Sequence, residues 1–236
     1  MLAVISQQTP KVAEEALRSL GHTTLRMPPH PALPAPVASH PDMLLFFASD
    51  AILCTKSYLT VAKDQLELLS SAASKPIQTV EEEYGAEYPH DILLNAAPLG
   101  SRLFCLPRAT AKRLTARADI SVHAVRQGYA KCSVIPLGEN AMVTSDPSIE
   151  TVAKRLGIHT LLLSPQGIFL KGYDHGFLGG CAGFSPYQPQ STVYFCGNID
   201  RYPEGERLKK FLEANRFRAC SLGDFPLTDV GTIFLI

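Results

Sequence analysis

Apolar residues recur every three or four positions in five stretches of the chain, a spacing that predicts helices with one buried face. Thr9 is the candidate N-cap of the first stretch, which has Pro10 at its first helical position and Gly21 just past its end. Asp146 and Pro147 begin the fourth stretch in the same way. The predicted helices span residues 10–20, 58–73, 109–116, 147–156 and 203–215.

Short apolar runs typical of strands surround each helix, in the order strand, turn, strand, helix, strand. This order occurs five times in 236 residues. A small sheet with one helix cannot bury its apolar faces alone, so neighbouring units must cover them. The predicted units span approximately residues 41–80, 90–126, 131–164, 178–223, and 225–236 joined with 1–28.

The last unit is divided between the two ends of the chain. Pairing of the C-terminal strand "DVGTIFLI" with the N-terminal strand "MLAVIS" would join these ends and remove free sheet edges. We therefore expect a single domain over residues 1–236 with an α/β fold. Its architecture is predicted to be a five-fold pseudosymmetric α/β propeller of ββαβ units, with the ring closed by the terminal strands.

Composition and charge narrow the classes of partner. Lys plus Arg and Asp plus Glu both number 22, so the chain lacks the basic excess typical of nucleic-acid binders. No apolar run approaches the roughly 18 residues that a membrane helix needs. The N-terminus lacks the basic start and long apolar stretch of a signal peptide. We expect a cytoplasmic protein that binds neither nucleic acid nor membrane.

The six cysteines are scattered, without a C-x-x-C pair. Four of them lie in apolar, strand-like runs, which favours buried free thiols. No cluster of Cys and His has the spacing of a zinc site, so we expect neither a metal nor another cofactor. The four strand-like cysteines are Cys54, Cys105, Cys132 and Cys196.

A carboxylate precedes the first apolar run of two units. Asp42 opens the run in "HPDMLLFFASDAILCTK", and Asp91 opens the run in "YPHDILL". The two stretches resemble the F-V-E-D and E-x-G-D-V-L-F motifs of dimethylargininases, and "YAKC" at 129–132 resembles their H-L-K-S. Together with the five-fold repeat, these motifs make the chain similar to the pentein, or guanidine-modifying, superfamily. The chain also resembles an uncharacterised bacterial branch of that fold.

The resemblance implies that the first strand of each unit points at a central axis. There, Asp42 and Asp91 could bind a planar, cationic guanidinium through paired hydrogen bonds. Alternatively, both acids cap the ends of strands or turns. Tyr129, Lys131 and Asp229 complete the predicted ligand-binding set.

The catalytic residues of the superfamily do not carry over to this chain. Guanidine-modifying chemistry needs a nucleophilic thiolate, a His that moves protons and a carboxylate that orients it. The resemblance places Tyr129 at the His position, Tyr88 at the Glu position, and Val230 or Gly231 at the Cys position. The sequence therefore predicts a protein without the usual cysteine chemistry.

One other stretch contains residues for nucleophilic catalysis. In "YDHGFLGGCAGF", Cys181 follows two glycines, and His175 lies six residues before it, next to Asp174. A Cys–His pair with an acid is a nucleophilic constellation. The alternative is that Cys181 is a small core residue and His175 lies in a surface loop.

Three hypotheses follow for function. The first is a protein that binds a small guanidine- or amine-type ligand on the axis without catalysis. The second is a C–N hydrolase or amidinotransferase-like enzyme that uses Cys181 and His175. The third is a non-catalytic scaffold for a protein partner. The sequence is compatible with a homodimer in each case.

Overall fold

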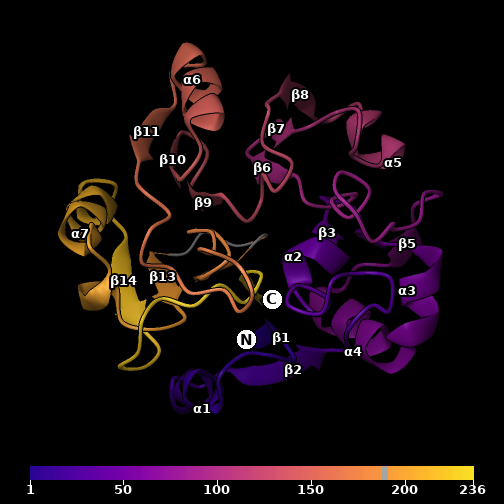
Figure 1. The fold of residues 1–236 in the computed structure, drawn as a ribbon. Coiled ribbons are helices and arrows are strands. Elements are labelled where there is room, and N and C mark those ends of the chain that lie inside the picture. Colours follow the sequence, from indigo (N-terminus) through magenta and orange to yellow (C-terminus); the bar gives the residue numbers. More distant parts are fainter. Residues whose placement is uncertain (186, 188–190) are drawn as a thin grey trace.

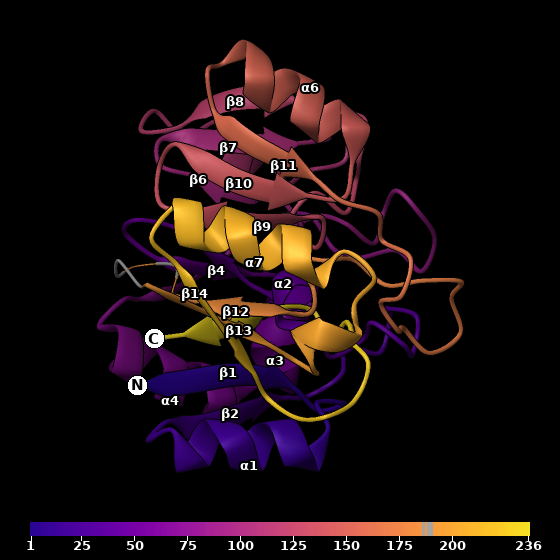
Figure 2. The same cartoon turned by 90° about the vertical axis from the view of Figure 1, so that its left-hand side faces the viewer.

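The computed structural model describes residues 1–185, 187 and 191–236. Its strands occur in five successive groups of three that surround a common centre, while helices lie towards the outside (Figure 1). Seen at 90° to this view, α1 (Lys11–Ser19) and α6 (Pro147–Arg155) lie at opposite ends, with the sheets between them (Figure 2). The protein is therefore a mixed α/β fold.

Three of the groups, β3 to β5, β6 to β8 and β9 to β11, each form a separate three-stranded sheet. In each sheet the first strand is antiparallel to the second, and the second is parallel to the third. Helices connect the parallel strands, which need a long crossover. The strands are β3 (Phe46–Phe47), β4 (Ile52–Cys54), β5 (Ile77–Thr79), β6 (Ala97–Leu99), β7 (Arg102–Cys105), β8 (Ser121–Ala124), β9 (Val134–Leu137), β10 (Ala141–Thr144) and β11 (His159–Leu162). The helices are α3 (Lys56–Val61), α4 (Lys63–Ala73), α5 (Lys112–Thr115) and α6.

The fourth and fifth groups share one six-stranded sheet. Its members are β1 (Leu2–Ser6), β2 (Thr23–Met27), β12 (Ala182–Phe184), β13 (Thr192–Phe195), β14 (Arg218–Ser221) and β15 (Ile233–Leu235). Their order is β14-β13-β12-β15-β1-β2, and β15 is antiparallel to β1, so the predicted pairing of the terminal strands is present. The other elements of this half are α1, α7 (Gly205–Ala214) and the 3₁₀-helix η1 (Ile199–Arg201). Among the described strands the groups are otherwise unpaired with one another, and the closed five-fold propeller stays a prediction.

The core follows the first and second strands of the units. Strands β3, β4, β10, β12 and β15 are buried along their whole length. Strands that are covered on both faces form near-continuous apolar runs, which is why they stand out in the sequence. The predicted burial of Cys54, Cys105, Cys132 and Cys196 is confirmed, and all four are free thiols.

The two runs that begin with an acid are not continuous strands, contrary to prediction. Pro41–Leu44 form the short helix α2, in which Pro41 fits the first position and Asp42 lies in the first turn. Asp91 lies in a series of turns, and its strand begins only at Ala97. Both acids therefore precede an inner strand by several residues and are buried at its entrance.

The helix ends are partly as predicted. Asp146 caps α6 by accepting hydrogen bonds from the backbone N–H groups of Ser148 and Ile149. Thr9 does not cap α1: Pro10 occupies the cap position, and the buried Thr9 hydroxyl has no partner in the described part of the chain. The helix predicted over 58–73 is divided at Ala62 into α3 and α4. None of the helices in the described residues has the length and hydropathy needed to cross a bilayer.

Candidate functional site

Four side chains from three units meet at the entrances of the inner strands. Asp42 Oδ2 accepts hydrogen bonds from Thr232 Oγ1 at 2.8 Å and from Cys132 Sγ at 3.2 Å. Lys131 Nζ donates to Thr232 Oγ1 at 3.0 Å. All four residues are buried. A polar network in this apolar setting fixes the relative position of the three units.

Asn95 holds the same network together through its side-chain amide. Its Oδ1 accepts from the backbone N–H groups of Lys131 at 2.9 Å and Cys132 at 3.3 Å. Its Nδ2 donates to the backbone oxygen of Asp42 at 3.2 Å and to Cys132 Sγ at 3.0 Å. The amide therefore connects the first and third units through the second.

Asp229 has both carboxylate oxygens bound by the backbone. Oδ2 accepts from Phe177 N–H at 2.8 Å, and Oδ1 accepts from Gly231 N–H at 3.0 Å. Gly180 packs directly on this carboxylate, because a Cβ at Gly180 would overlap it. Of the three predicted axial acids, Asp229 is thus the one whose two oxygens are both held by backbone N–H groups.

Burial sets the ionisation of this cluster. Desolvation raises the pKa of Asp42, although Lys131 opposes the shift, and it raises the pKa of Asp229 to about 6. The same effect lowers the pKa of His40 to about 4 and lowers the pKa of Lys131. His40 Nδ1 is 3.8 Å from Asp229 Oδ1, but these pKa values leave no pH at which both groups are mainly charged.

Asp91 forms a second polar centre with Tyr129. The Tyr129 hydroxyl donates to Asp91 Oδ2 at 2.6 Å. The ring of half-buried Tyr129 lies 5.8 Å from the rings of both Tyr88 and Phe177, measured between centroids. His175 extends this row, 5.9 Å from Phe177. An aromatic row therefore covers a buried carboxyl group, whose pKa is raised by desolvation.

Each of the two leading acids retains one unsatisfied oxygen. Asp42 Oδ1 and Asp91 Oδ1 are both buried without a hydrogen-bond partner in the described part of the chain. Buried polar atoms nearly always have partners, so these two oxygens call for an explanation. A bound donor group would supply the missing hydrogen bonds.

The resemblance assigns the nucleophile position to Val230 or Gly231. Val230 packs in the core beside Ala3 and Ile5. Gly231 has a left-handed backbone with φ +72° and lies against His40, where a Cβ would overlap the imidazole. Neither Val230 nor Gly231 has a side chain that could act as a nucleophile.

Cys181 and His175 occupy different surroundings. Cys181 is fully buried in a hydrophobic cluster, and its Sγ donates to Leu178 O at 3.0 Å. Burial raises the pKa of this thiol well above its usual value, which disfavours the thiolate. His175 is half-buried and its Nδ1 lies 3.0 Å from Gly176 O. In the described residues no hydrogen bond joins the two side chains.

The sequence-based set omitted four members of the cluster, namely His40, Asn95, Cys132 and Thr232. Short spacings to predicted acids could have indicated two of them, because His40 precedes Asp42 by two residues and Asn95 follows Asp91 by four. Nothing local marks the hydrogen bond between Thr232 and Asp42, which spans 190 residues. No group of three or more metal-ligating side chains occurs in the described part of the chain.

Comparison with solved structures identifies the fold. The chain is similar to DDAH from Pseudomonas aeruginosa complexed with citrulline, with TM-score 0.56, 8% identity, and coverage of 93% of this chain and 91% of that chain. It is similar to agmatine deiminase from C. jejuni, with TM-score 0.56, 9% identity, and coverage of 94% and 86%. It is also similar to an amidinotransferase from Microseira wollei, with TM-score 0.54, 12% identity, and coverage of 95% and 81%. The protein therefore has the pentein, or guanidine-modifying, fold.

Sequence comparisons give the family. No curated protein matches the sequence. One family model matches residues 4–234, which is nearly the whole chain. The likeness to these solved structures shows the fold, and one fold can host many functions. The chain belongs to the family described as "Family of unknown function (DUF6873)".

Proposed function

We propose that this protein binds a small cationic ligand of the guanidine or amidine class at Asp91, without the cysteine chemistry of the superfamily. The observation that carries the proposal is the buried Asp91 Oδ1, which has no hydrogen-bond partner in the described residues. A guanidinium or amidinium would donate the missing hydrogen bond and neutralise the carboxylate. The named guanidine enzymes among the structural relatives agree with this ligand class.

The aromatic row supports a planar cation at this position. The Tyr129 hydroxyl donates to Asp91. The Tyr129 ring lies 5.8 Å from the rings of Phe177 and Tyr88, and Tyr88 is half exposed. Aromatic faces attract cations, and guanidinium groups stack on them particularly well. Since Asp91 is buried, a ligand would reach Oδ1 only if part of the aromatic row moved aside.

Asp42 and Asp229 are less suited to the cation. The network through Thr232 places the Lys131 ammonium near Asp42, where its charge repels a second cation. Asp229 already accepts two backbone hydrogen bonds. We therefore assign these acids to the support of the site, and we place the guanidinium at Asp91.

A catalytic role has less support. Burial raises the pKa of the Cys181 thiol well above its usual value, and it does the same for Cys132, which disfavours the thiolate of both. Neither thiol is paired with a histidine in the described part of the chain. A nucleophilic mechanism would need one of these thiols to ionise in an apolar site, which burial opposes.

Isothermal titration calorimetry tests the proposal with two isosteric pairs. Methylguanidine and agmatine carry the cation, while methylurea and N-carbamoylputrescine replace the guanidinium with a neutral urea. The variant is Asp91→Asn, and the matched control is Asp64→Asn on the exposed face of α4. We expect the two guanidinium compounds to bind, with affinity reduced at least tenfold in Asp91→Asn and unchanged in Asp64→Asn. Equal affinity in Asp91→Asn, or no binding of either guanidinium compound, would overturn the proposal.

A further inference from the structure

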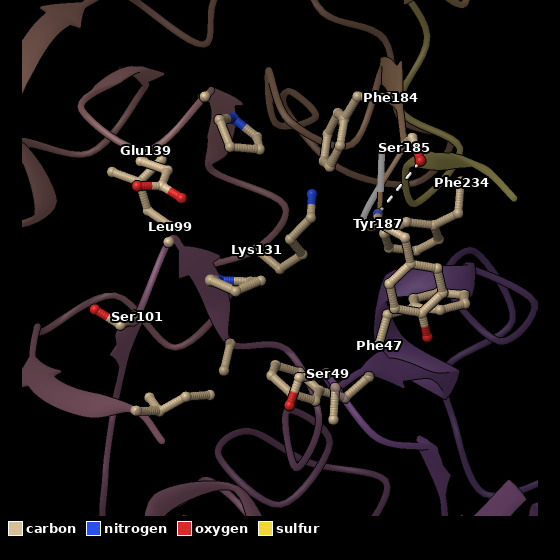
Figure 3. A pocket seen from close by; sticks show the side chains of 18 of the residues that line it. Phe47, Ser49, Leu99, Ser101, Lys131, Glu139, Phe184, Ser185, Tyr187 and Phe234 are labelled. Atoms are coloured by element: carbon tan, nitrogen blue, oxygen red, sulfur yellow. Dashed lines mark hydrogen bonds between the residues drawn. The ribbon is translucent and has the colours of Figure 1, made fainter. Parts of the chain in front are cut away.

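Lys131 lines a cavity of about 570 Å³ that Asp42 and Thr232 do not line. Figure 3 shows it between the inner strands, with the Lys131 side chain reaching into its middle. Its size suits a small organic molecule. Exposed residues Ser49, Ser101 and Glu139 lie on its lining, so it opens to solvent. Its walls are mainly apolar and include Leu45, Phe47, Leu94, Leu99, Phe184 and Phe234.

The Lys131 ammonium is incompletely paired in this cavity. In the described part of the chain its one hydrogen bond is the 3.0 Å bond to Thr232 Oγ1. Nζ also lies 4.5 Å from the centroid of the Phe184 ring and 5.6 Å from that of Phe234. An ammonium has three N–H donors, so two remain for another partner. The residue is only 4% exposed, so water satisfies these donors poorly.

We propose that this cavity binds a small monocarboxylate with an apolar body, whose carboxylate accepts hydrogen bonds from Lys131. The cation selects an anionic head, and the apolar walls select an aliphatic or aromatic body. Glu139 also lines the cavity and would repel a ligand with a second negative charge. This site differs from the guanidine site, because Asp91 and Tyr129 do not line the cavity.

Calorimetry with a matched series of eight-carbon ligands tests this proposal. Octanoate carries the anionic head, octanamide is its neutral analogue, and octylamine reverses the charge. We expect octanoate to bind at least tenfold more tightly than octanamide, and octylamine to bind most weakly. Equal affinity for octanoate and octanamide would overturn the proposal, because the cavity would then recognise only the apolar body.

Two variants assign the binding to this cavity. Lys131→Met keeps the length of the side chain but removes the charge, and exposed Lys171→Met is its control. We expect octanoate affinity to fall at least tenfold in Lys131→Met and to stay unchanged in Lys171→Met. Ser101→Trp, which fills the exposed mouth and leaves Lys131 intact, should also weaken binding and serves if Lys131→Met does not fold. Unchanged affinity in either Lys131→Met or Ser101→Trp would contradict the site.

Discussion

The Tyr129 hydroxyl donates a 2.6 Å hydrogen bond to Asp91 Oδ2, while Asp91 Oδ1 has no partner in the described residues. One oxygen is thus held by the protein and the other is available to a donor. Tyr129 occupies the position that the family resemblance assigns to a histidine. A phenol whose pKa is raised by burial cannot act as a base near neutral pH, but it can hold a carboxylate in place.

Tyr129→Phe should destabilise the protein by about 1–3 kcal/mol, because it leaves both oxygens of a buried carboxyl group without a partner. Urea unfolding at pH 7 measures this change. Tyr173→Phe is the matched control, since Tyr173 is 48% exposed. Its effect should stay within about 0.5 kcal/mol. An equal effect of both substitutions would show that the Tyr129 hydroxyl does not stabilise Asp91.

His40 should make stability rise with pH between about 4 and 6.5. Its pKa is about 4 in the folded protein, so over this range the unfolded chain binds more protons than the folded one. Asp229 acts in the opposite direction: its folded pKa of about 6 lies above the unfolded value, so its contribution falls as pH rises from about 4 to 6. The two effects offset each other in the natural protein.

His40→Gln removes only the first of these contributions. The stability of the natural protein relative to His40→Gln should therefore increase by up to roughly 3 kcal/mol from pH 4 to pH 7. Urea unfolding at four pH values in this range measures the difference. The exposed His159→Gln is the control and should show a much smaller trend. A flat difference for His40→Gln would mean that His40 titrates normally in the folded state.

Gly180→Ala should destabilise the protein by at least about 2 kcal/mol, since its Cβ would overlap the Asp229 carboxylate and disturb two buried hydrogen bonds. Gly138→Ala provides the comparison, because Gly138 has φ +68° and open space around it. Its strain alone should amount to about 1–2 kcal/mol. Chemical denaturation measures both, and a milder effect at Gly180 than at Gly138 would contradict the packing described above.

Cys181 should resist alkylation by iodoacetamide in the native protein. Its thiol is buried and its pKa is raised well above the usual value, whereas Cys220 is half-buried. Mass spectrometry of briefly treated protein should find Cys220 labelled first and Cys181 labelled only after unfolding. Rapid labelling of Cys181 at pH 7 would instead reveal an activated thiolate and would restore the enzyme hypothesis.

The order of elements could be predicted from the sequence, because each unit carries its own signals. Asp146 and Pro147 mark the start of α6, and buried strands appear as apolar runs. The apolar run that begins with Asp42 was wrongly predicted as a strand. Met43 and Leu44 are as apolar as strand residues, but they follow Pro41, which favours a helical turn. Patterns of hydrophobicity cannot separate a short buried turn from a short buried strand.

The candidate site could be predicted only in part. The resemblance drew attention to Asp42, Asp91 and Tyr129, and the structure joins the last two by a hydrogen bond. It could not show that Phe177 donates to Asp229 or that Thr232 lies beside Asp42, because these contacts join residues far apart in the sequence. The cavity beyond Lys131 has no signature in the sequence for the same reason.

The most direct test of guanidinium binding at Asp91 is a crystal structure of the protein grown with agmatine. The account predicts a guanidinium nitrogen within about 3 Å of Asp91 Oδ1, with the cation against Tyr129 or Phe177. The account is contradicted if the agmatine lies elsewhere, or if Asp91 Oδ1 stays buried beneath Tyr129 while agmatine saturates the solution.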